Sequence, residues 1–169
     1  MTPEASRPEE RFARLAAAIR REIERIGAVV LEAEQALVEL AQRTPPLREL
    51  RGCGDIVHDF YTGVERIFQK IAPELNGGLP AGAAWHRELL ENMTLDLPGI
   101  RPPLLARDTA RQLDEFLRFR HLFRNVYGFE LEWPKLRGLL GRMAPAWQAV
   151  QADTQHLLAF LDAAACPPA

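Results

Sequence analysis

The sequence predicts an all-α protein, an antiparallel bundle of four main helices and one short helix. Apolar residues recur in steps of three and four through most of the chain, which is the spacing of amphipathic helices. No stretch shows the alternation with period two that a half-buried strand requires. A length of 169 residues with 47% apolar residues suits one hydrophobic core. We therefore expect one domain over residues 1–169, with frayed tails at 1–8 and 164–169.

The first half of the chain predicts two long helices. The first covers 8–43, would run roughly 50 Å at about 1.5 Å per residue, and ends at the Thr-Pro-Pro of 44–46. The second covers about 47–72, and Pro73 with the Asn-Gly-Gly of 76–78 ends it. Both carry a continuous apolar face for packing against neighbouring helices.

The second half predicts a structured connection and two further helices. Prolines and glycines punctuate residues 73–103, where a short helix is expected at about 83–93. A fourth helix follows over 104–127, and a fifth begins at Pro134, a favourable first-turn residue. We expect Pro145 to kink or split the fifth helix. The spacing of the first and last helices suits packing within one chain and could also support a dimer.

Composition excludes several classes of protein. The formal charge of −2 excludes a globally basic nucleic-acid coat protein but leaves room for a local basic patch. Cys53 and Cys166 form no C-x-x-C pair, which excludes a disulfide framework and a thiolate zinc site; Cys53 is expected in the core and Cys166 in the tail. The charged N-terminus and the lack of a long apolar window indicate a soluble, cytoplasmic protein that does not span a membrane.

The arginine-rich segment 118–127 holds the strongest candidates for chemistry. At about 100° per residue, Arg120, Arg124 and Tyr127 fall within a sector of roughly 60°, which predicts one polar strip. His121 and Asn125 lie one turn apart on its far flank. Between positions 101 and 124 there are six arginines against three acidic residues, so phosphate binding is physically reasonable. A solvated helix face with cations near its C-terminus is the simpler interpretation of the same pattern.

Other polar groups give weaker signals. Asp55, His58 and Asp59 share a helical face that could hold a metal, but acids are expected at a helix start anyway, and we predict no metal site. His86 and His156 have no partner at ligand spacing, so we expect each to be a surface or interface histidine. No serine or cysteine nucleophile stands beside a histidine at a telling spacing.

Several segments of the chain, including the arginine-rich segment 118–127, together resemble the HepT-like branch of the HEPN superfamily. These are small helical proteins that act as ribonuclease toxins beside nucleotidyltransferase antitoxins. The family's motif is an arginine, a short spacer, and a histidine commonly followed by any residue and a tyrosine. Arg120 takes the arginine position, Asn125 the histidine position and Tyr127 the tyrosine position. The resemblance is carried by residues 54–61 with Glu65, then 93–94, 101–103, 113–116 and 120–131.

The resemblance implies cofactor-free, metal-independent cleavage of single-stranded RNA by attack of a 2′-hydroxyl on the neighbouring phosphorus. Arg120 and Arg124 would hold the phosphate and stabilise its growing charge. Asn125 departs from the motif, because an amide cannot exchange a proton near pH 7. His121, one turn earlier, could supply the proton transfer, with Asn125 and Tyr127 orienting the nucleotide.

The resemblance also implies partners and a control mechanism. The motif would lie at a homodimer interface, and a nucleotidyltransferase antitoxin would transfer AMP to Tyr127, placing negative charge beside the arginines. Two alternatives remain open: a catalytically silent module that binds a nucleotidyltransferase or RNA without cleavage, favoured by Asn125, and a purely structural helical adaptor.

Overall fold

The computed structural model describes residues 7–125 and 130–166, and it is helical as predicted. Helix α1 begins and α5 ends inside the ranges expected as tails; residues 1–6 and 167–169 lie outside the described residues. In chain order the helices are α1 (Pro8–Glu39), α2 (Leu47–Leu75), α3 (Trp85–Asn92), α4 (Arg107–Asn125) and α5 (Trp133–Ala165).

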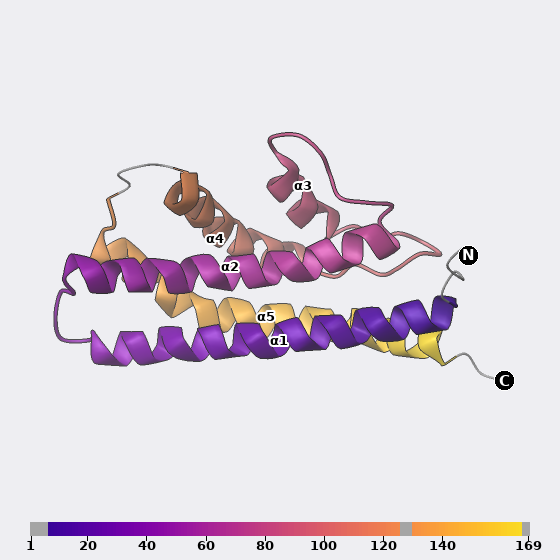
Figure 1. Ribbon diagram of the computed structural model, residues 1–169, viewed down its shortest axis with the longest axis horizontal. Helices are drawn as coiled ribbons and strands as arrows, with labels where there is room; N and C mark the ends of the chain where they lie inside the picture. The colour runs from indigo at the N-terminus through magenta and orange to yellow at the C-terminus, as the bar shows by residue number, and fades with distance from the viewer. Residues whose placement is uncertain (1–6, 126–129, 167–169) are drawn as a thin grey trace, which may run out of the picture.

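The three long helices form an elongated base that carries the two shorter ones. Helix α1 packs against α2 and α5 along the long axis of the molecule (Figure 1). Helices α3 and α4 lie on the opposite side of α2 from α1, where α4 also contacts α5 (Figure 1). Helix α2 is therefore covered on two sides, which explains why so many of its side chains are buried.

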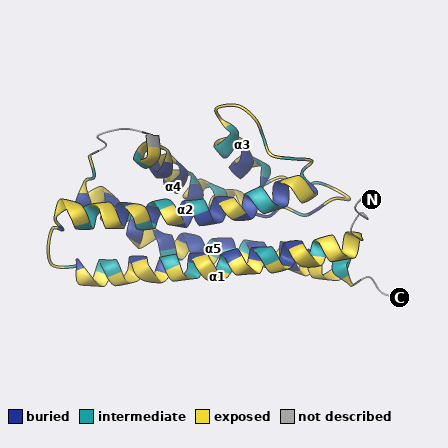
Figure 2. Ribbon diagram, in the orientation of Figure 1, coloured by how far each residue is buried: buried dark blue, intermediate teal, exposed yellow. Residues whose placement is uncertain are grey.

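The core follows the predicted apolar stripes. Buried residues line the inward faces of the long helices, while their outer faces are exposed (Figure 2). Phe60 of α2 meets Phe116 of α4 edge to face, with ring centroids 4.9 Å apart, a favourable geometry for aromatic pairs. As expected, Cys53 is buried and Cys166 is exposed; burial raises the pKa of the Cys53 thiol.

The two helices of the first half end differently from the prediction. Helix α1 stops at Glu39, four residues before the predicted end at 43, and turns at 40–42 lead into α2. Helix α2 continues through Pro73 to Leu75, because a proline in the last turn removes only one backbone hydrogen bond and Leu75 is buried. Gly77, at a φ of 77°, then ends the helix, and the amide of Gly78 donates to the Ala72 carbonyl at 3.0 Å.

Helix α4 begins at Arg107, later than the predicted residue 104. The amides of Leu104 and Leu105 donate to the Met93 carbonyl instead, and the Asp153 carboxylate of α5 accepts the Ala106 amide at 2.8 Å. These bonds fix the start of α4 to α3 and α5.

Helix α5 is continuous through Pro145, so the expected split is wrong. The proline removes one hydrogen bond, while Met143, Ala146 and Trp147 are buried on both sides of it. Core packing of those side chains outweighs the local defect.

Arg101 holds the loop between α3 and α4 together. Its side chain is only 2% exposed, and it donates to the Asn76 side chain and to the carbonyls of Asn92, Leu95 and Pro102 at 2.8–3.1 Å. Burial lowers the pKa of this guanidinium. Arg101 is therefore a structural residue, and it does not contribute to the basic patch in which its sequence position placed it.

Gly63 allows α1 and α2 to pack closely. A Cβ at this position would lie 2.7 Å from Cγ1 of Ile26, whereas a Cβ at Gly52 of the same helix would meet nothing within 4 Å. We expect Gly63→Ala to lower the free energy of unfolding by about 1–2 kcal/mol through overpacking. Gly52→Ala should raise it by up to ~1 kcal/mol through helix propensity. Urea unfolding followed by circular dichroism measures both; equal effects would contradict the close approach.

Candidate nucleic-acid interface

A pocket of about 410 Å³ opens between the start of α3 and the second half of α4. It contains an arginine and a histidine from α3 and two arginines and a histidine from α4, beside apolar side chains. The residues that line it are Ala83, Ala84, His86, Arg87, Leu117, Arg118, Arg120, His121 and Leu122.

Arg120 lies at the floor of this pocket and is only 6% exposed. Its Nη2 lies 3.2 Å from Oε1 of Glu65, and its Nε donates to Oγ1 of Thr62 at 3.2 Å. Arg120 therefore does not share a solvent-facing surface with the exposed Arg124 of the predicted polar strip, because its guanidinium turns towards α2. A buried guanidinium requires such a counter-ion, and Glu65 is itself only 2% exposed.

His86 is bound to the same carboxylate. Its Nδ1 lies 2.6 Å from Oε2 of Glu65 and 3.5 Å from Nη1 of Arg120. The shorter contact decides the tautomer: Nδ1–H donates to Glu65, and a nitrogen that carries this proton cannot accept from Arg120. Among the described residues Nη1 of Arg120 therefore has no acceptor, and it remains able to bind an anion in the pocket.

Sequence reasoning missed both Glu65 and His86 as site residues. We expected His86 to be a surface or interface histidine, yet its side chain is 24% exposed and takes part in the Glu65 cluster. The two lie 21 positions apart, so no helical spacing relates them. In the sequence, Glu65 stands out only as one of the residues that carry the family resemblance, and this resemblance is the signal that points to it.

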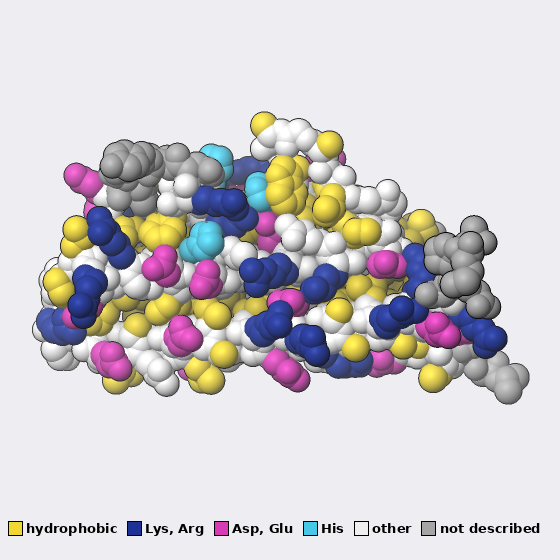
Figure 3. All heavy atoms as spheres, viewed as in Figure 1, with side chains coloured by type: hydrophobic (Ala, Val, Ile, Leu, Met, Phe, Trp, Pro, Cys, Tyr) yellow, Lys and Arg dark blue, Asp and Glu magenta, His cyan; other side chains and the backbone are white. Residues whose placement is uncertain are grey.

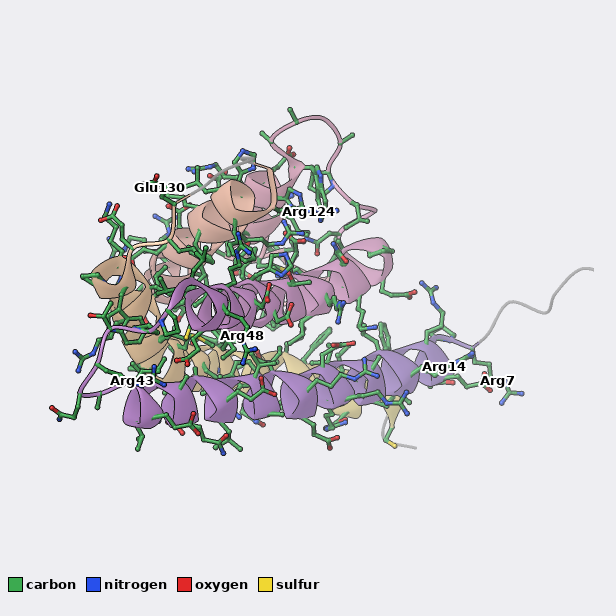
Figure 4. All side chains as sticks on the ribbon, turned by 60° about the vertical axis from the view of Figure 1, so that its left-hand side comes forward. Arg7, Arg14, Arg43, Arg48, Arg124 and Glu130 are labelled. Carbon is green, nitrogen blue, oxygen red and sulfur yellow. The ribbon has the colours of Figure 1, made fainter. Side chains whose placement is uncertain are left out.

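The other predicted site residues separate into two groups. His121 is exposed and lines the pocket, one residue after Arg120. Arg124 is exposed and extends from the last turn of α4 (Figure 4), but it does not line this pocket. The side chain of Asn125 and the whole of Tyr127 lie outside the described residues.

The surface around the pocket is basic and rich in histidine. Figure 3 shows histidine and arginine side chains gathered on the face where α2, α3 and α4 meet. Arg87 and Arg118 both pair with Asp114, at 3.4 and 2.5 Å, so two guanidinium groups share one carboxylate at the rim. An anion that approaches this rim meets a net positive field.

Only some of the six arginines counted in the sequence lack a carboxylate partner and could bind a phosphate without breaking an ion pair. Besides the buried Arg101 and Arg120, Arg118 pairs with Asp114 and Arg111 pairs with Asp108. Within the described ranges, Arg107 and Arg124 form no ion pair.

The group of Asp55, His58 and Asp59, considered above as a weak candidate for a metal site, lies where α2 packs against the end of α4. Nδ1 of His58 lies 3.1 Å from the Asp59 carboxylate, and the His58 ring packs 6.0 Å from the Phe123 ring of α4. Nearby, a Cβ on Gly54 would lie 2.6 Å from the same phenylalanine ring, so this glycine lets the end of α4 approach α2 closely. Over 7–125 and 130–166, no three His, Cys, Asp or Glu side chains form a group that could hold a metal.

A comparison with protein-family models settles the relationship that the motif indicated. The model of the family described as "HepT-like protein" matches residues 52–161. The chain belongs to the HepT-like family. No curated protein and no solved structure matches the chain.

The match covers most of α2 to α5 of this HepT-like chain. It runs from the second turn of α2 to four residues before the end of α5 and includes the pocket and the Glu65 cluster, while α1 lies outside it. None of the helices over the described residues has the length and apolar composition needed to cross a bilayer.

We expect Arg120→Leu to lower the free energy of unfolding by about 3–5 kcal/mol, because it leaves the buried Glu65 carboxylate without its guanidinium. The double variant Glu65→Leu/Arg120→Leu should recover part of this loss, since neither charge then remains buried. Urea unfolding of the wild type, both single variants and the double variant measures the coupling energy. Losses of the two single variants that simply add in the double variant would show that the two side chains are not energetically coupled.

Tyr61 provides a pH-dependent test of the packing beside this cluster. Its ring is fully buried, and its hydroxyl has no hydrogen-bond partner within the part of the chain that the structure describes. Burial, and then the charge of Glu65, raise the pKa of the phenol far above its ordinary value. Above pH ~10 the unfolded chain loses this proton and the folded chain keeps it, so stability falls by about 1.4 kcal/mol per pH unit from this group.

Tyr61→Phe should remove that alkaline component and leave stability at pH 7 unchanged or slightly higher, because no hydrogen bond is lost. Unfolding curves at pH 7, 10 and 11 compare the two proteins. Parallel losses in both above pH 10 would contradict the buried, neutral phenol.

Proposed function

We propose that this HepT-like chain is a metal-independent endoribonuclease that cleaves single-stranded RNA, the toxin of a pair with a nucleotidyltransferase antitoxin. One observation carries the proposal: Arg120 and His121, adjacent on α4, line the same basic pocket. A guanidinium and an imidazole in one pocket are the groups that phosphodiester cleavage by an internal 2′-hydroxyl requires.

The geometry supports distinct roles for the two side chains. Nη1 of Arg120, which lacks an acceptor among the described residues, would bind a non-bridging phosphate oxygen and stabilise the charge that grows on it. His121 would exchange a proton with an oxygen at the reacting phosphorus. The rim arginines Arg87 and Arg118 would attract the backbone of the RNA. The proposed chemistry uses imidazole and guanidinium groups and needs no metal.

The remaining parts of the proposal rest on the family resemblance. A second copy of the chain would bring two motifs to one cleft in a homodimer. Arg124, exposed at the end of α4, would contact the RNA backbone beyond the pocket. Tyr127 would be the residue to which the antitoxin transfers AMP, adding an anion close to these arginines.

A catalytically silent binding module is the second candidate. Asn125 occupies the motif position where an imidazole would titrate, and Glu65 already neutralises Arg120. Such a protein would bind RNA or a nucleotidyltransferase through the same basic rim without cutting.

Incubation of the purified protein with labelled single-stranded RNA in excess EDTA tests the two candidates. We expect cleavage that leaves 2′,3′-cyclic phosphate ends, and no cleavage when the nucleotide 5′ of the scissile phosphate is 2′-deoxy. Arg120→Lys should lower kcat/KM by about 100-fold or more, because it keeps the buried charge but loses the forked donor set. His121→Ala should lower it by a similar factor.

A matched control lies in a different hollow of the same protein. His156 is exposed and lines a pocket formed by the loop before α4, the start of α4 and α5, so His156→Ala should leave cleavage unchanged. Cleavage that survives both Arg120→Lys and His121→Ala would refute the site. RNA binding without cleavage by the wild type, with cleavage appearing in Asn125→His, would favour the silent module.

A further inference from the structure

We propose that His86 is a catalytic residue of this site, the general base that removes the proton of the 2′-hydroxyl, and that Glu65 positions it. The inference rests on the proposed function and deepens it. In this proposal the imidazole of His86, on α3, takes the role of the imidazole that the motif would place at position 125 of α4.

Two contacts fix the imidazole of His86. The Glu65 carboxylate accepts its Nδ1–H at 2.6 Å. The indole of Trp85 stacks on its face, with centroids 3.6 Å apart and planes inclined by 30°. Nη1 of Arg120 lies 3.5 Å from the same nitrogen, but it makes no hydrogen bond there because that nitrogen carries a proton. A ring held on one edge and one face is pre-organised, which is what proton transfer at a defined distance requires.

The Glu65 contact also sets which nitrogen can act. Because Nδ1 carries the proton, Nε2 holds the lone pair, and over the described ranges no residue bonds to it. His86 lines the pocket and is 24% exposed, so a substrate hydroxyl can reach the ring. A carboxylate behind an imidazole holds it in this tautomer and stabilises the imidazolium that forms when it accepts a proton.

The two histidines of the pocket divide the proton transfers. Nε2 of His86 takes the proton of the 2′-hydroxyl as that oxygen attacks phosphorus. The bond from phosphorus to the 5′-oxygen breaks, and His121 donates a proton to the departing oxygen. The products are a 2′,3′-cyclic phosphate and a 5′-hydroxyl, and water restores both imidazoles to their starting states. Arg120 remains charged throughout and stabilises the pentacoordinate phosphorus.

The charged groups that face His86 come from three helices. Glu65 approaches from α2, Arg120 and His121 from α4, and Arg87 is its neighbour on α3. A general base must be neutral to act, so the acidic limb of the pH profile of kcat/KM reports His86, and the profile of each variant tests the assignment.

The central experiment compares His86→Asn and His86→Ala with the wild type and with His156→Ala. Asparagine can still donate a hydrogen bond to Glu65 but cannot exchange a proton near pH 7. We expect both His86 variants to lower kcat by about 100-fold or more with little change in KM, and to lose the acidic limb. Added imidazole should restore cleavage in His86→Ala only. His156→Ala should behave as the wild type.

Glu65→Gln tests the positioning role. Removal of the carboxylate charge takes away the group that stabilises the imidazolium formed during proton transfer, so kcat should fall with little change in KM, a split that simple loosening of the fold would not produce. A second readout needs no activity: nitrogen NMR of ¹⁵N-histidine protein should show His86 as the Nδ1–H tautomer, and this tautomer should be lost in Glu65→Leu, which offers Nδ1–H no acceptor.

The outcomes separate this inference from the proposed function. Wild-type protein that cuts no RNA overturns both. Wild-type protein that cuts RNA, with His86→Asn retaining full kcat and an unchanged acidic limb, overturns the role of His86 alone. An Nε2–H tautomer at His86 also overturns it, because the lone pair would then face Glu65.

Discussion

A single buried carboxylate, that of Glu65, joins three helices of this fold. It accepts a hydrogen bond from His86 of α3 at 2.6 Å and pairs with Arg120 of α4 at 3.2 Å, while its own backbone lies in the middle of α2. A carboxylate that is 2% exposed is unfavourable by several kcal/mol unless such partners surround it. The α3–α4 layer must therefore sit on α2 in one register, and the pocket between these helices takes its shape from that requirement.

The same interaction sets the chemical state of the pocket. Glu65 uses one oxygen for each partner, which leaves His86 with a defined tautomer and leaves Nη1 of Arg120 without an acceptor among the described residues. An apolar residue at position 65 could pack the helices as well or better, since buried ion pairs are weak sources of net stability. The pair is better understood as a device that orients polar groups towards the pocket, at some expense in stability.

Most of the fold was predictable from the sequence, and most of the site was not. Apolar spacing located every described helix to within a few residues, because each is amphipathic and its period is a local property. Local rules failed where packing overrides them: α5 runs through Pro145 because buried side chains flank it, and α2 runs through Pro73 to the buried Leu75.

The site was harder to predict. The helical spacing placed Arg120 beside Arg124 on one polar strip, but the Glu65 charge on α2 draws Arg120 inward. No spacing rule connects His86 to either residue, because that contact exists only after three helices have packed.

This difference between what the sequence of one helix shows and what the packed helices show changes how the asparagine at position 125 is interpreted. Read along α4 alone, the sequence has an amide at Asn125 and one imidazole, that of His121, for the two proton transfers of the proposed reaction. Viewed across the packed helices, the pocket around Arg120 holds two imidazoles, one from the same helix and one from α3. The proposed cleavage requires an imidazole at a fixed distance from the phosphate, and the fold can supply one from any element that reaches the pocket. A departure from the motif at one position of α4 is therefore not evidence of lost activity until the residues that the other helices bring to the same pocket have been considered.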